Sequence, residues 1–484
     1  MFYDTPRTKN SVKFHNYRNF IKRLTLNLEE YEQLKRAFAG GFTHANPFYS
    51  GEIVENVDSF DFTSSYPYVM VSEKFPMSTP QKVIIKSEDD FRKNLKKYCC
   101  LFDVTFYNLK PKVYYENYIS VSKCRNIKGV QENNGRVVQA TELTITITEQ
   151  DFLIIEKFYS WDSIKVFNFK RMIKDYLPKD LILSILDLYK KKTELKDIEE
   201  YIVEYMVSKN MINAVYGMTV TDICRDEILY DYDWYNEKPD YEQALEKYNN
   251  SLKRFLYYPW GIWVTAYARK NLFTGIYEFG EDYRYSDTDS IKVVNTQNHI
   301  NYINAYNNMV RTKLFNMCKH YNIDVELTKP KNKYGEEKEL GIWEHECTYI
   351  RFKTLGAKRY LTELKKKING RYENVLTLTV SGVNKKKAIE YLIYKYGYEN
   401  VFDVFSDKLE IPALYINNDG KEVSATGKMT HTYIDEEKEG YLTDYLGNRE
   451  YYKELSAIHL KDCEYNLSLS EIYINFLLNI KQLT

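Results

Sequence analysis

The sequence predicts a multi-domain α+β protein, and three observations support this fold class. The chain of 484 residues is too long for one compact domain and long enough for two to four. Strand-like segments at 52–72 and 283–294 carry aspartates at or beside turns. Between them lie two segments with the apolar spacing of long helices.

Coarse periodicity predicts the order of the elements. Residues 52–72 are typical of a strand that carries an aspartate into a turn ending at Pro67, and residues 82–165 resemble a small separate module of short β-like runs. Two helices are expected at 179–196 and 199–216. The remaining expected elements are a polar, aromatic insertion after Gly217, a helix near 262–279, a β-hairpin at 283–294, and a last third of Lys-rich helices and short strands.

The charge balance excludes a protein that binds nucleic acid through bulk positive charge. Lys plus Arg and Asp plus Glu each number 68, so any DNA channel has to arise by segregating charge. Local basic clusters lie at 190–196, 365–367 and 385–387, and clusters of this kind are usually solvated surface. The 47 Tyr residues suit stacking on bases, although most are expected in cores and on strands.

The positions of cysteine and histidine and the pattern of hydropathy exclude several further classes of protein. The 7 Cys have no CxxC spacing and the 7 His are scattered, so neither a disulfide framework nor a zinc site is predicted. No run has the length of a signal-peptide core or the roughly 18 apolar residues of a membrane span. We therefore expect a cytoplasmic, soluble monomer without a membrane partner.

Two carboxylates mark the predicted hairpin. Asp287 and Asp289 flank Thr288 at its tip, where like charges are costly unless a divalent cation neutralises them, so the arrangement favours Mg²⁺. A lone DxD triplet arises by chance among 68 acidic residues. Asp61 strengthens the interpretation because it also lies at a strand end, three residues before Ser64. The alternative for Asp61 is a carboxylate that only caps a turn.

Three segments resemble the motifs of family B DNA polymerases, in that family's order. DFTSSYP at 61–67 resembles motif A (DxxSLYP), KNMINAVYG at 209–217 resembles motif B (KxxxNSxYG), and YSDTDS at 285–290 resembles motif C (YxDTDS). FAGG at 38–41 is similar to the YxGG motif of protein-primed members, and KRY at 358–360 is similar to the KxY motif. The chain departs from these patterns by placing Ser65 for Leu, Ala214 for Ser and Phe38 for Tyr.

The resemblance implies a right-hand polymerase, with a palm that contains an antiparallel sheet, helical fingers, a small thumb and two insertions. The implied domains are an N-terminal segment with the first part of the palm (1–80), an insertion resembling terminal protein region 1 (81–170), fingers (171–217), an insertion resembling terminal protein region 2 (218–258), palm (259–375), and the end of the palm with the thumb (376–484).

The resemblance also implies two-metal nucleotidyl transfer to a primer 3′-hydroxyl, with Asp61, Asp287 and Asp289 as catalytic residues and ligands of two Mg²⁺, for which Mn²⁺ can substitute. Lys209, Asn213 and Tyr216 fall on one face of a helix and would contact the incoming dNTP. Tyr66 would pack under the sugar and exclude ribonucleotides. Ser64, Ser65 and Lys196 complete the implied nucleotide-binding set, with a surface lysine as the alternative for Lys196.

The implied DNA-binding residues are Phe38, Gly40, Gly41, Gly217, Thr288, Ser290, Lys358 and Tyr360. The expected partners are a DNA primer-template, dNTPs, a terminal priming protein and a separate exonuclease chain. Only about 60 residues precede Asp61, too few for a proofreading exonuclease domain, and no convincing set of exonuclease motifs is found, so the chain is expected to lack 3′–5′ exonuclease activity. Two explanations stay open: a separate nuclease chain supplies this activity, or the protein tolerates errors. Two alternatives stay open, a polymerase of altered task (template-independent or self-priming) and a non-catalytic DNA-end binding protein.

Overall fold

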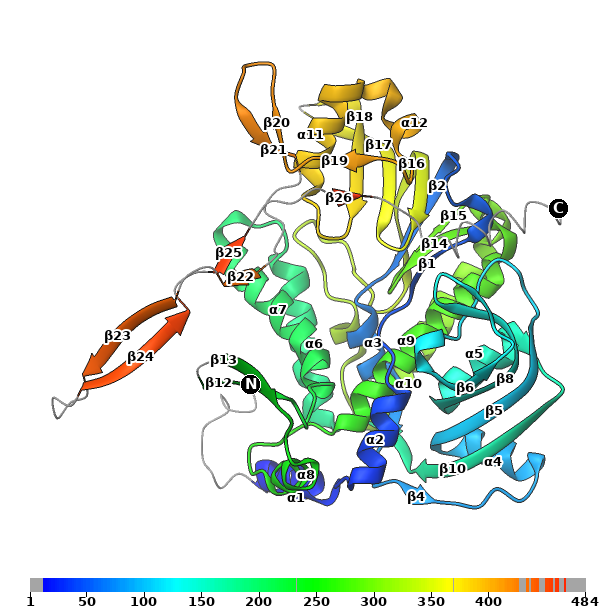
Figure 1. Ribbon diagram of the computed structural model, residues 1–484. Coiled ribbons are helices and arrows are strands. Elements are labelled where there is room, and N and C mark those ends of the chain that lie inside the picture. The colour runs from blue at the N-terminus through cyan, green and yellow to red at the C-terminus, as the bar shows by residue number, and fades with distance from the viewer. Residues whose placement is uncertain are drawn as a thin grey trace. The chain divides into compact units, whose positions relative to one another are not determined.

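The computed structural model describes residues 12–231, 233–368, 370–425, 432–434, 437–443, 449–455, 458–460 and 465–466 (Figure 1). Contacts divide the chain into two units. Unit 1 comprises Met1–Phe42, Phe60–Ile291 and Asn295–Glu346, and unit 2 comprises Thr43–Ser59, Lys292–Val294 and Cys347–Thr484. The predicted thumb, at 376–484, lies largely outside the described residues beyond 425.

A seven-stranded sheet has the order β1-β14-β15-β2-β16-β17-β18. Its strands are β1 (Thr43–Ala45), β2 (Val54–Phe62), β14 (Tyr283–Asp287), β15 (Ser290–Val293), β16 (Trp343–Gly356), β17 (Arg359–Ile368) and β18 (Arg371–Val380). The strand expected to carry Asp61 and the hairpin expected at 283–294 are therefore confirmed. In unit 2, β17 pairs antiparallel with both β16 and β18, with Leu361 opposite Lys353 and Leu378.

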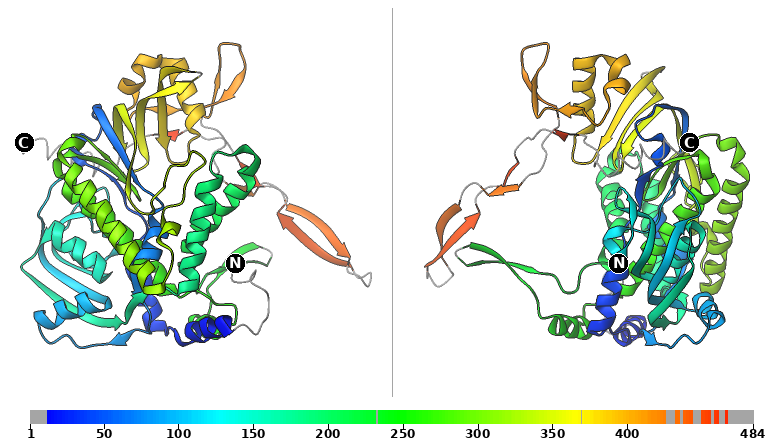
Figure 2. Two further views of the ribbon diagram at one scale, coloured as in Figure 1. Left: turned by 180° about the vertical axis from the view of Figure 1, so that it is seen from behind. Right: turned by 45° about the vertical axis from the view of Figure 1, so that its right-hand side comes forward.

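The first predicted insertion forms a second antiparallel sheet in unit 1, with the order β4-β10-β5-β8-β6. Its main elements are β4 (Gln81–Lys82), α4 (Glu88–Lys97), β5 (Cys99–Pro111), β6 (Cys124–Lys128), β7 (Gln131–Asn133), β8 (Arg136–Thr148), α5 (Glu149–Phe158), β9 (Tyr159–Ser160) and β10 (Ser163–Met172). The β-like runs expected in this segment are confirmed as strands, of which β5 and β8 each span 13 residues. Phe91, Phe102 and Phe152 pack edge to face, with ring centroids 5.2–5.9 Å apart, and fix α4 and α5 on this sheet (Figure 2, cyan).

Six further helices of unit 1 include α3, which carries residues of motif A, and α7, which carries motif B. They are α2 (Leu28–Ala37), α3 (Ser65–Ser72), α6 (Lys179–Leu195), α7 (Ile202–Thr219), α9 (Tyr258–Phe279) and α10 (Ile300–Tyr321). The helices expected at 179–196, 199–216 and 262–279 are confirmed, with shifted ends. The turn expected to end at Pro67 is instead the first turn of α3, a position that tolerates proline because its missing N–H has no helical partner.

Helix α9 is the centre of the unit 1 core. Its side chains are buried along nearly the whole length, and Trp260 and Trp263 are fully buried. The indole Nε1 of Trp263 donates to the Glu149 carboxylate at 3.0 Å, which ties α9 to α5. The first insertion therefore shares a core with the rest of unit 1.

The remaining elements belong to both units. In unit 1 they are α1 (Val12–Arg23), β3 (Lys74–Pro76), β11 (Lys174–Tyr176), β12 (Glu227–Asp231), β13 (Asp233–Glu237) and α8 (Tyr241–Asn250). In unit 2 they are α11 (Lys385–Tyr396), α12 (Val401–Val404), β19 (Glu410–Ile411), β20 (Leu414–Ile416), β21 (Glu422–Ser424), β22 (Thr432–Ile434), β23 (Glu437–Thr443), β24 (Arg449–Leu455), β25 (Ile458–Leu460) and β26 (Tyr465–Asn466). None of the described helices has the length and apolarity to cross a membrane.

Candidate active site

The backbone places the three predicted aspartates at the ends of strands that lie in one sheet. Asp61 lies one residue before the end of β2, and Asp287 and Asp289 bracket the turn between β14 and β15. The Phe62 N–H donates to the Asp289 carbonyl oxygen at 2.8 Å, and the Asp289 N–H donates to that of Asp287 at 2.7 Å. The chain segments of motifs A and C are therefore directly hydrogen-bonded.

The turn that presents these carboxylates is conformationally strained. Thr288 has φ 59°, a left-handed conformation that is rare for a β-branched residue. Its N–H donates to the Phe42 carbonyl oxygen at 2.6 Å, and its Oγ1 donates to Asp287 Oδ1 at 3.1 Å. The loop that contains Phe42 therefore holds Thr288 in place. The resemblance implies that Thr288 contacts DNA, and in this structure both of these hydrogen bonds join it to the protein itself.

The electrostatics of this turn favour a bound cation. Burial, followed by the negative charge of Asp287, raises the pKa of Asp289 from 3.8 to about 6, and Lys192 opposes this rise. Such a hard-oxygen donor pair suits Mg²⁺, which needs only one or two carboxylates when phosphate and water complete its shell. Across the described ranges, however, no three His, Cys, Asp or Glu side chains converge on a point able to hold a metal ion. The three-carboxylate metal set stays a prediction.

Lys192 is a site residue that the sequence reasoning did not single out. Its Nζ donates to Ser64 Oγ at 2.8 Å. Burial and the positive charges of Lys196 and Lys209 lower its pKa, whereas Asp61 and Asp289 raise it. Lys192 lies one turn after the buried pair Leu188 and Tyr189 on α6, and this spacing could have indicated that it faces inward.

The structure brings residues of motifs A and B together through their aromatic rings. The rings of Tyr66 and Tyr216 lie 4.3 Å apart between centroids, with a 37° tilt. Burial is the main cause of the raised pKa of Tyr66. Ser64, which precedes α3, has φ 56° and is a second left-handed residue at the site. Ser65 is buried, so it serves packing in this structure.

The stripe predicted on α7 lies on one continuous helix. Lys209 and Asn213 are exposed and Tyr216 is half-buried, while Ser208, Ile212 and Thr219 form the buried side. Gly217 is also exposed on α7, and a Cβ there would meet nothing. Lys196 is exposed at the end of α6, close enough to lower the pKa of Lys192.

Two residues contact the FAGG segment: Arg269 hydrogen-bonds to its backbone, and Thr288 packs against Gly41. Arg269 on α9 donates to the carbonyl oxygens of Ala39 and of Gly40, the latter at 3.0 Å, and its guanidinium also pairs with Asp151 at 2.7 Å. A Cβ on Gly41 would lie 2.7 Å from Thr288 Oγ1. The resemblance implies that Gly41 contacts DNA, and in the structure its missing side chain leaves the space that Thr288 occupies. Phe38 ends α2, and its N–H donates to the Leu34 carbonyl oxygen.

Three further predicted DNA contacts have local roles in the structure. Ser290 Oγ donates to the Asp287 carbonyl oxygen at 3.4 Å. Lys358 and Tyr360 lie in unit 2, where Lys358 has φ 57° in the turn between β16 and β17. Tyr360 pairs with Thr354 and Thr379, and its ring centroid lies 5.6 Å from that of Phe352.

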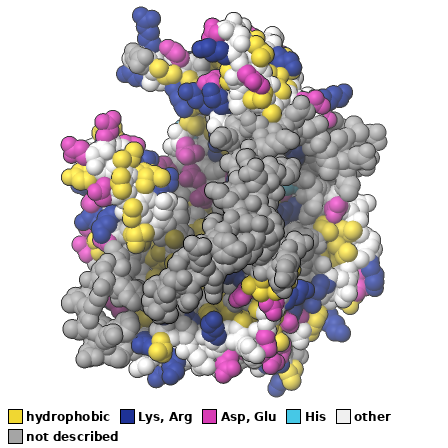
Figure 3. Space-filling view, turned by 60° about the vertical axis from the view of Figure 1, so that its left-hand side comes forward, with side chains coloured by type: hydrophobic (Ala, Val, Ile, Leu, Met, Phe, Trp, Pro, Cys, Tyr) yellow, Lys and Arg dark blue, Asp and Glu magenta, His cyan; other side chains and the backbone are white. Residues whose placement is uncertain are grey.

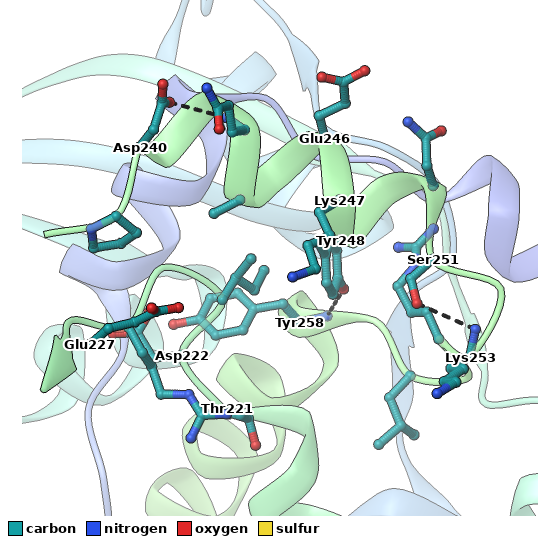
Figure 4. A pocket seen from close by; sticks show the side chains of 18 of the residues that line it. Thr221, Asp222, Glu227, Asp240, Glu246, Lys247, Tyr248, Ser251, Lys253 and Tyr258 are labelled. Atoms are coloured by element: carbon teal, nitrogen blue, oxygen red, sulfur yellow. Dashed lines mark hydrogen bonds between the residues drawn. The ribbon is translucent and has the colours of Figure 1, made fainter. Parts of the chain in front are cut away.

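A pocket of about 1790 Å³ lies in the second predicted insertion. Residues between 218 and 258 line it (Figure 4). Asp240 accepts hydrogen bonds at the start of α8, and the Tyr258 N–H donates to the Tyr248 hydroxyl at 3.0 Å. Acidic and basic side chains both line it, so its lining favours no class of ligand. The visible face in Figure 3 likewise intersperses both signs of charge.

Comparisons with known proteins agree with these motifs. The family described as DNA polymerase type B, organellar and viral, matches residues 9–308. The DNA polymerase of Bacillus phage Nf is 24% identical over 366 residues, which are 75% of this chain and 55% of that protein. The DNA polymerase of Bacillus phage phi29 is 21% identical over 371 residues, again 75% and 55%. The chain thus spans about half the length of these curated relatives.

Solved structures share the fold. Phi29 DNA polymerase complexed with primer-template DNA and incoming nucleotides has a TM-score of 0.57 and 17% identity, over 95% of this chain and 66% of that one. The same enzyme complexed with single-stranded DNA has a TM-score of 0.59 and 17% identity, over 96% and 66%. The α+β class predicted from the sequence is confirmed by this likeness.

Proposed function

This chain belongs to the organellar and viral family of type B DNA polymerases, and on that premise we propose that it is a DNA-directed DNA polymerase. It would add dNTPs to a primer 3′-hydroxyl or to the hydroxyl of a priming protein. The observation that carries the proposal is the hydrogen-bonded contact between the end of β2, with Asp61, and the turn with Asp287 and Asp289. The raised pKa of Asp289 supports it, because a carboxylate crowded in this way gains most from a divalent cation.

Each motif has a distinct task in the proposed reaction. The primer 3′-oxygen attacks the α-phosphorus, the bond to the bridging oxygen breaks, and pyrophosphate leaves. Mg²⁺ held by Asp61, Asp287 and Asp289 would lower the pKa of the hydroxyl and neutralise charge on the phosphates. Lys192, Lys196 and Lys209 are the cations expected to hold the triphosphate, because their mutual repulsion falls when an anion lies between them.

The paired rings of Tyr66 and Tyr216 support a role in sugar selection. Two rings with centroids 4.3 Å apart form a rigid floor, which a 2′-hydroxyl would have to displace. The strained Ser64 turn would hold this floor in position, since it begins α3 and accepts the Lys192 hydrogen bond.

Protein priming forms part of the proposal. The segments 81–170 and 218–258 would contact a priming protein and help enclose the DNA, as their places between the motifs suggest. The phi29 enzyme, which shares the fold, has been solved with primer-template DNA and nucleotides, and this supports a primer-template as the substrate here.

Primer extension tests the proposal. A labelled primer on a DNA template is incubated with Mg²⁺ and dNTPs, comparing wild type with Asp289→Asn and with a reaction that lacks template. We expect template-encoded product that the variant does not make. Product without template would favour a template-independent or self-priming enzyme, and DNA binding without product would favour an end-binding protein. A reaction without dNTPs tests the expectation that the chain does not degrade primers from the 3′ end.

A further inference from the structure

The last turn of α7 packs directly on the first turn of α9. Gly261 of α9 has no side chain, and a Cβ there would lie 2.5 Å from Thr219 Oγ1 and 3.1 Å from the Thr219 carbonyl carbon, and would also overlap Val220 Cγ1. The missing side chain therefore makes room for the end of α7. Thr219 Oγ1 in turn donates to the Tyr216 carbonyl oxygen at 2.6 Å, so the same turn carries the motif B tyrosine.

Asp222, three residues beyond the end of α7, connects this turn to α2. Its Oδ1 accepts from the Cys224 N–H at 3.2 Å, which makes a local Asx turn, and also accepts from the Tyr31 hydroxyl. Lys35, one turn after Tyr31 on α2, donates to Asp222 Oδ2 at 2.9 Å. Partial burial acts to raise the pKa of Asp222, but the hydrogen bonds from Tyr31 and Lys35 outweigh it and lower the pKa. These bonds therefore favour the ionised carboxylate.

The rest of α7 is packed less tightly than this end. Of its residues, Ser208, Ile212 and Thr219 are buried, whereas Ile202 and Val203 in the first turn are 60% and 67% exposed. An element with few buried side chains opens locally at low cost. The attachments at its last turn therefore contribute strongly to the position of α7.

Aromatic rings link these attachments to the predicted nucleotide site. The Tyr31 ring lies 5.3 Å from that of Tyr258 between centroids, and Figure 4 shows the Tyr258 side chain pointing toward Asp222. Burial, Tyr66 and, more weakly, Tyr258 raise the pKa of Tyr216. The Tyr216 ring in turn packs 4.3 Å from that of Tyr66. Neighbouring rings thus lead from Tyr31 to Tyr66.

We propose that Asp222 and Tyr31 are positioning residues for nucleotide selection, which hold the end of α7 so that Tyr216 stays against Tyr66. Neither would touch the nucleotide, because Tyr31 is fully buried and both oxygens of Asp222 accept from protein donors. The inference rests on the proposed function, since sugar selection has a meaning only for a polymerase. Without the Asp222–Tyr31 bond, a 2′-hydroxyl would meet a less rigid pair of rings.

The test measures sugar discrimination, the ratio of kcat/KM for a dNTP to that for the matching rNTP, by single-nucleotide extension. Tyr31→Phe keeps the ring and removes the hydroxyl. We expect discrimination to fall about 5- to 10-fold, because small displacements of positioning groups change rates strongly. Tyr267→Phe is the matched control, since Tyr267 is also buried and its hydroxyl donates to the Lys74 carbonyl oxygen of β3 at 2.8 Å. The control should lose stability but keep the discrimination of wild type.

Two comparisons separate positioning from general destabilisation. Asp222→Ala should match Tyr31→Phe, whereas Asp222→Asn keeps a carbonyl oxygen for the Tyr31 hydroxyl and should restore most of the discrimination. In a Tyr66→Val background, Tyr31→Phe should cause little further loss, because the ring pair that it positions is already incomplete. An equal loss in both backgrounds, or a Tyr31→Phe protein that discriminates as well as Tyr267→Phe, would overturn the proposal.

Hydrogen exchange gives a readout that needs no polymerase activity. Under conditions of equal unfolding free energy, backbone amides at 216–220 should exchange faster in Tyr31→Phe than in Tyr267→Phe, while those of α6 should not. Equal exchange at 216–220 would reject the positioning of α7 whatever the activity. If wild type extends no primer but the exchange difference is present, the proposed function fails and the attachment of α7 through Asp222 stands.

Discussion

Substitution of Gly41 by Ala should displace the turn that carries Asp287 and Asp289. The new Cβ would lie 2.7 Å from Thr288 Oγ1 and 2.8 Å from its Cγ2, where ordinary contact begins at 3.4 Å. Relief therefore requires a shift of more than half an ångström. Both partners are constrained, since Thr288 is hydrogen-bonded to Phe42 and the Gly40 carbonyl is held by Arg269. Overpacking of this kind costs about 1–3 kcal/mol of unfolding free energy.

The shift should also reach the chemistry, because Thr288 lies between Asp287 and Asp289. Displacements near 1 Å can cost on the order of 100-fold in rate, so we expect kcat to fall about 10- to 100-fold. Steady-state primer extension measures kcat, and urea unfolding measures stability. The control is Gly40→Ala, because a Cβ at Gly40 meets nothing within 4 Å and should leave both quantities near wild type.

A double-mutant cycle tests whether contact between the new Cβ and Thr288 causes the losses of stability and of kcat. Thr288→Ala removes Oγ1 and Cγ2 and leaves only Cβ, 3.2 Å from the added methyl. We expect Gly41→Ala to cost less in the Thr288→Ala background, with a coupling energy of about 1 kcal/mol or more. Additive effects, or a Gly41→Ala protein as stable and active as Gly40→Ala, would refute the packing argument.

Four further predictions follow from the site. Metal-free Asp289→Asn should unfold at a higher temperature than wild type above pH 6, where folded Asp289 carries an unfavourable charge, and the difference should vanish as the pH falls below 3.8; a gap independent of pH would contradict this. Tyr66→Val should raise ribonucleotide incorporation in single-nucleotide extension while leaving the fold intact, whereas unchanged sugar selectivity would count against the Tyr66 assignment. Lys192→Gln should lower kcat/KM for dNTPs about 10- to 100-fold, while exposed Lys191→Gln should not; equal effects would remove Lys192 from the site. Asp151→Asn should cost about 3–5 kcal/mol in urea unfolding, because it leaves buried Arg269 without its counter-ion, and a loss below 1 kcal/mol would show that the pair is dispensable.

Local sequence patterns were sufficient to predict the elements that carry the motifs. The β-hairpin with Asp287 and Asp289 and the helices at 179–196 and 199–216 depend on short-range periodicity and turn chemistry, and they occur where expected. Spacing also placed Lys209, Asn213 and Tyr216 on one helix. Motif order then indicated the family and its fold.

Tertiary structure decided which distant residues meet, because such contacts leave no local pattern. It brought Lys192 to Ser64, packed the Tyr66 ring against that of Tyr216 and placed Gly41 against Thr288. It also showed that the first insertion shares the α9 core through the Asp151–Arg269 pair, although its β-like runs had suggested a separate module. The sequence by itself determined which chemical groups are present and on which elements they lie. Packing decided their partners, since burial and neighbouring charge exist only once chain segments far apart in sequence are folded together.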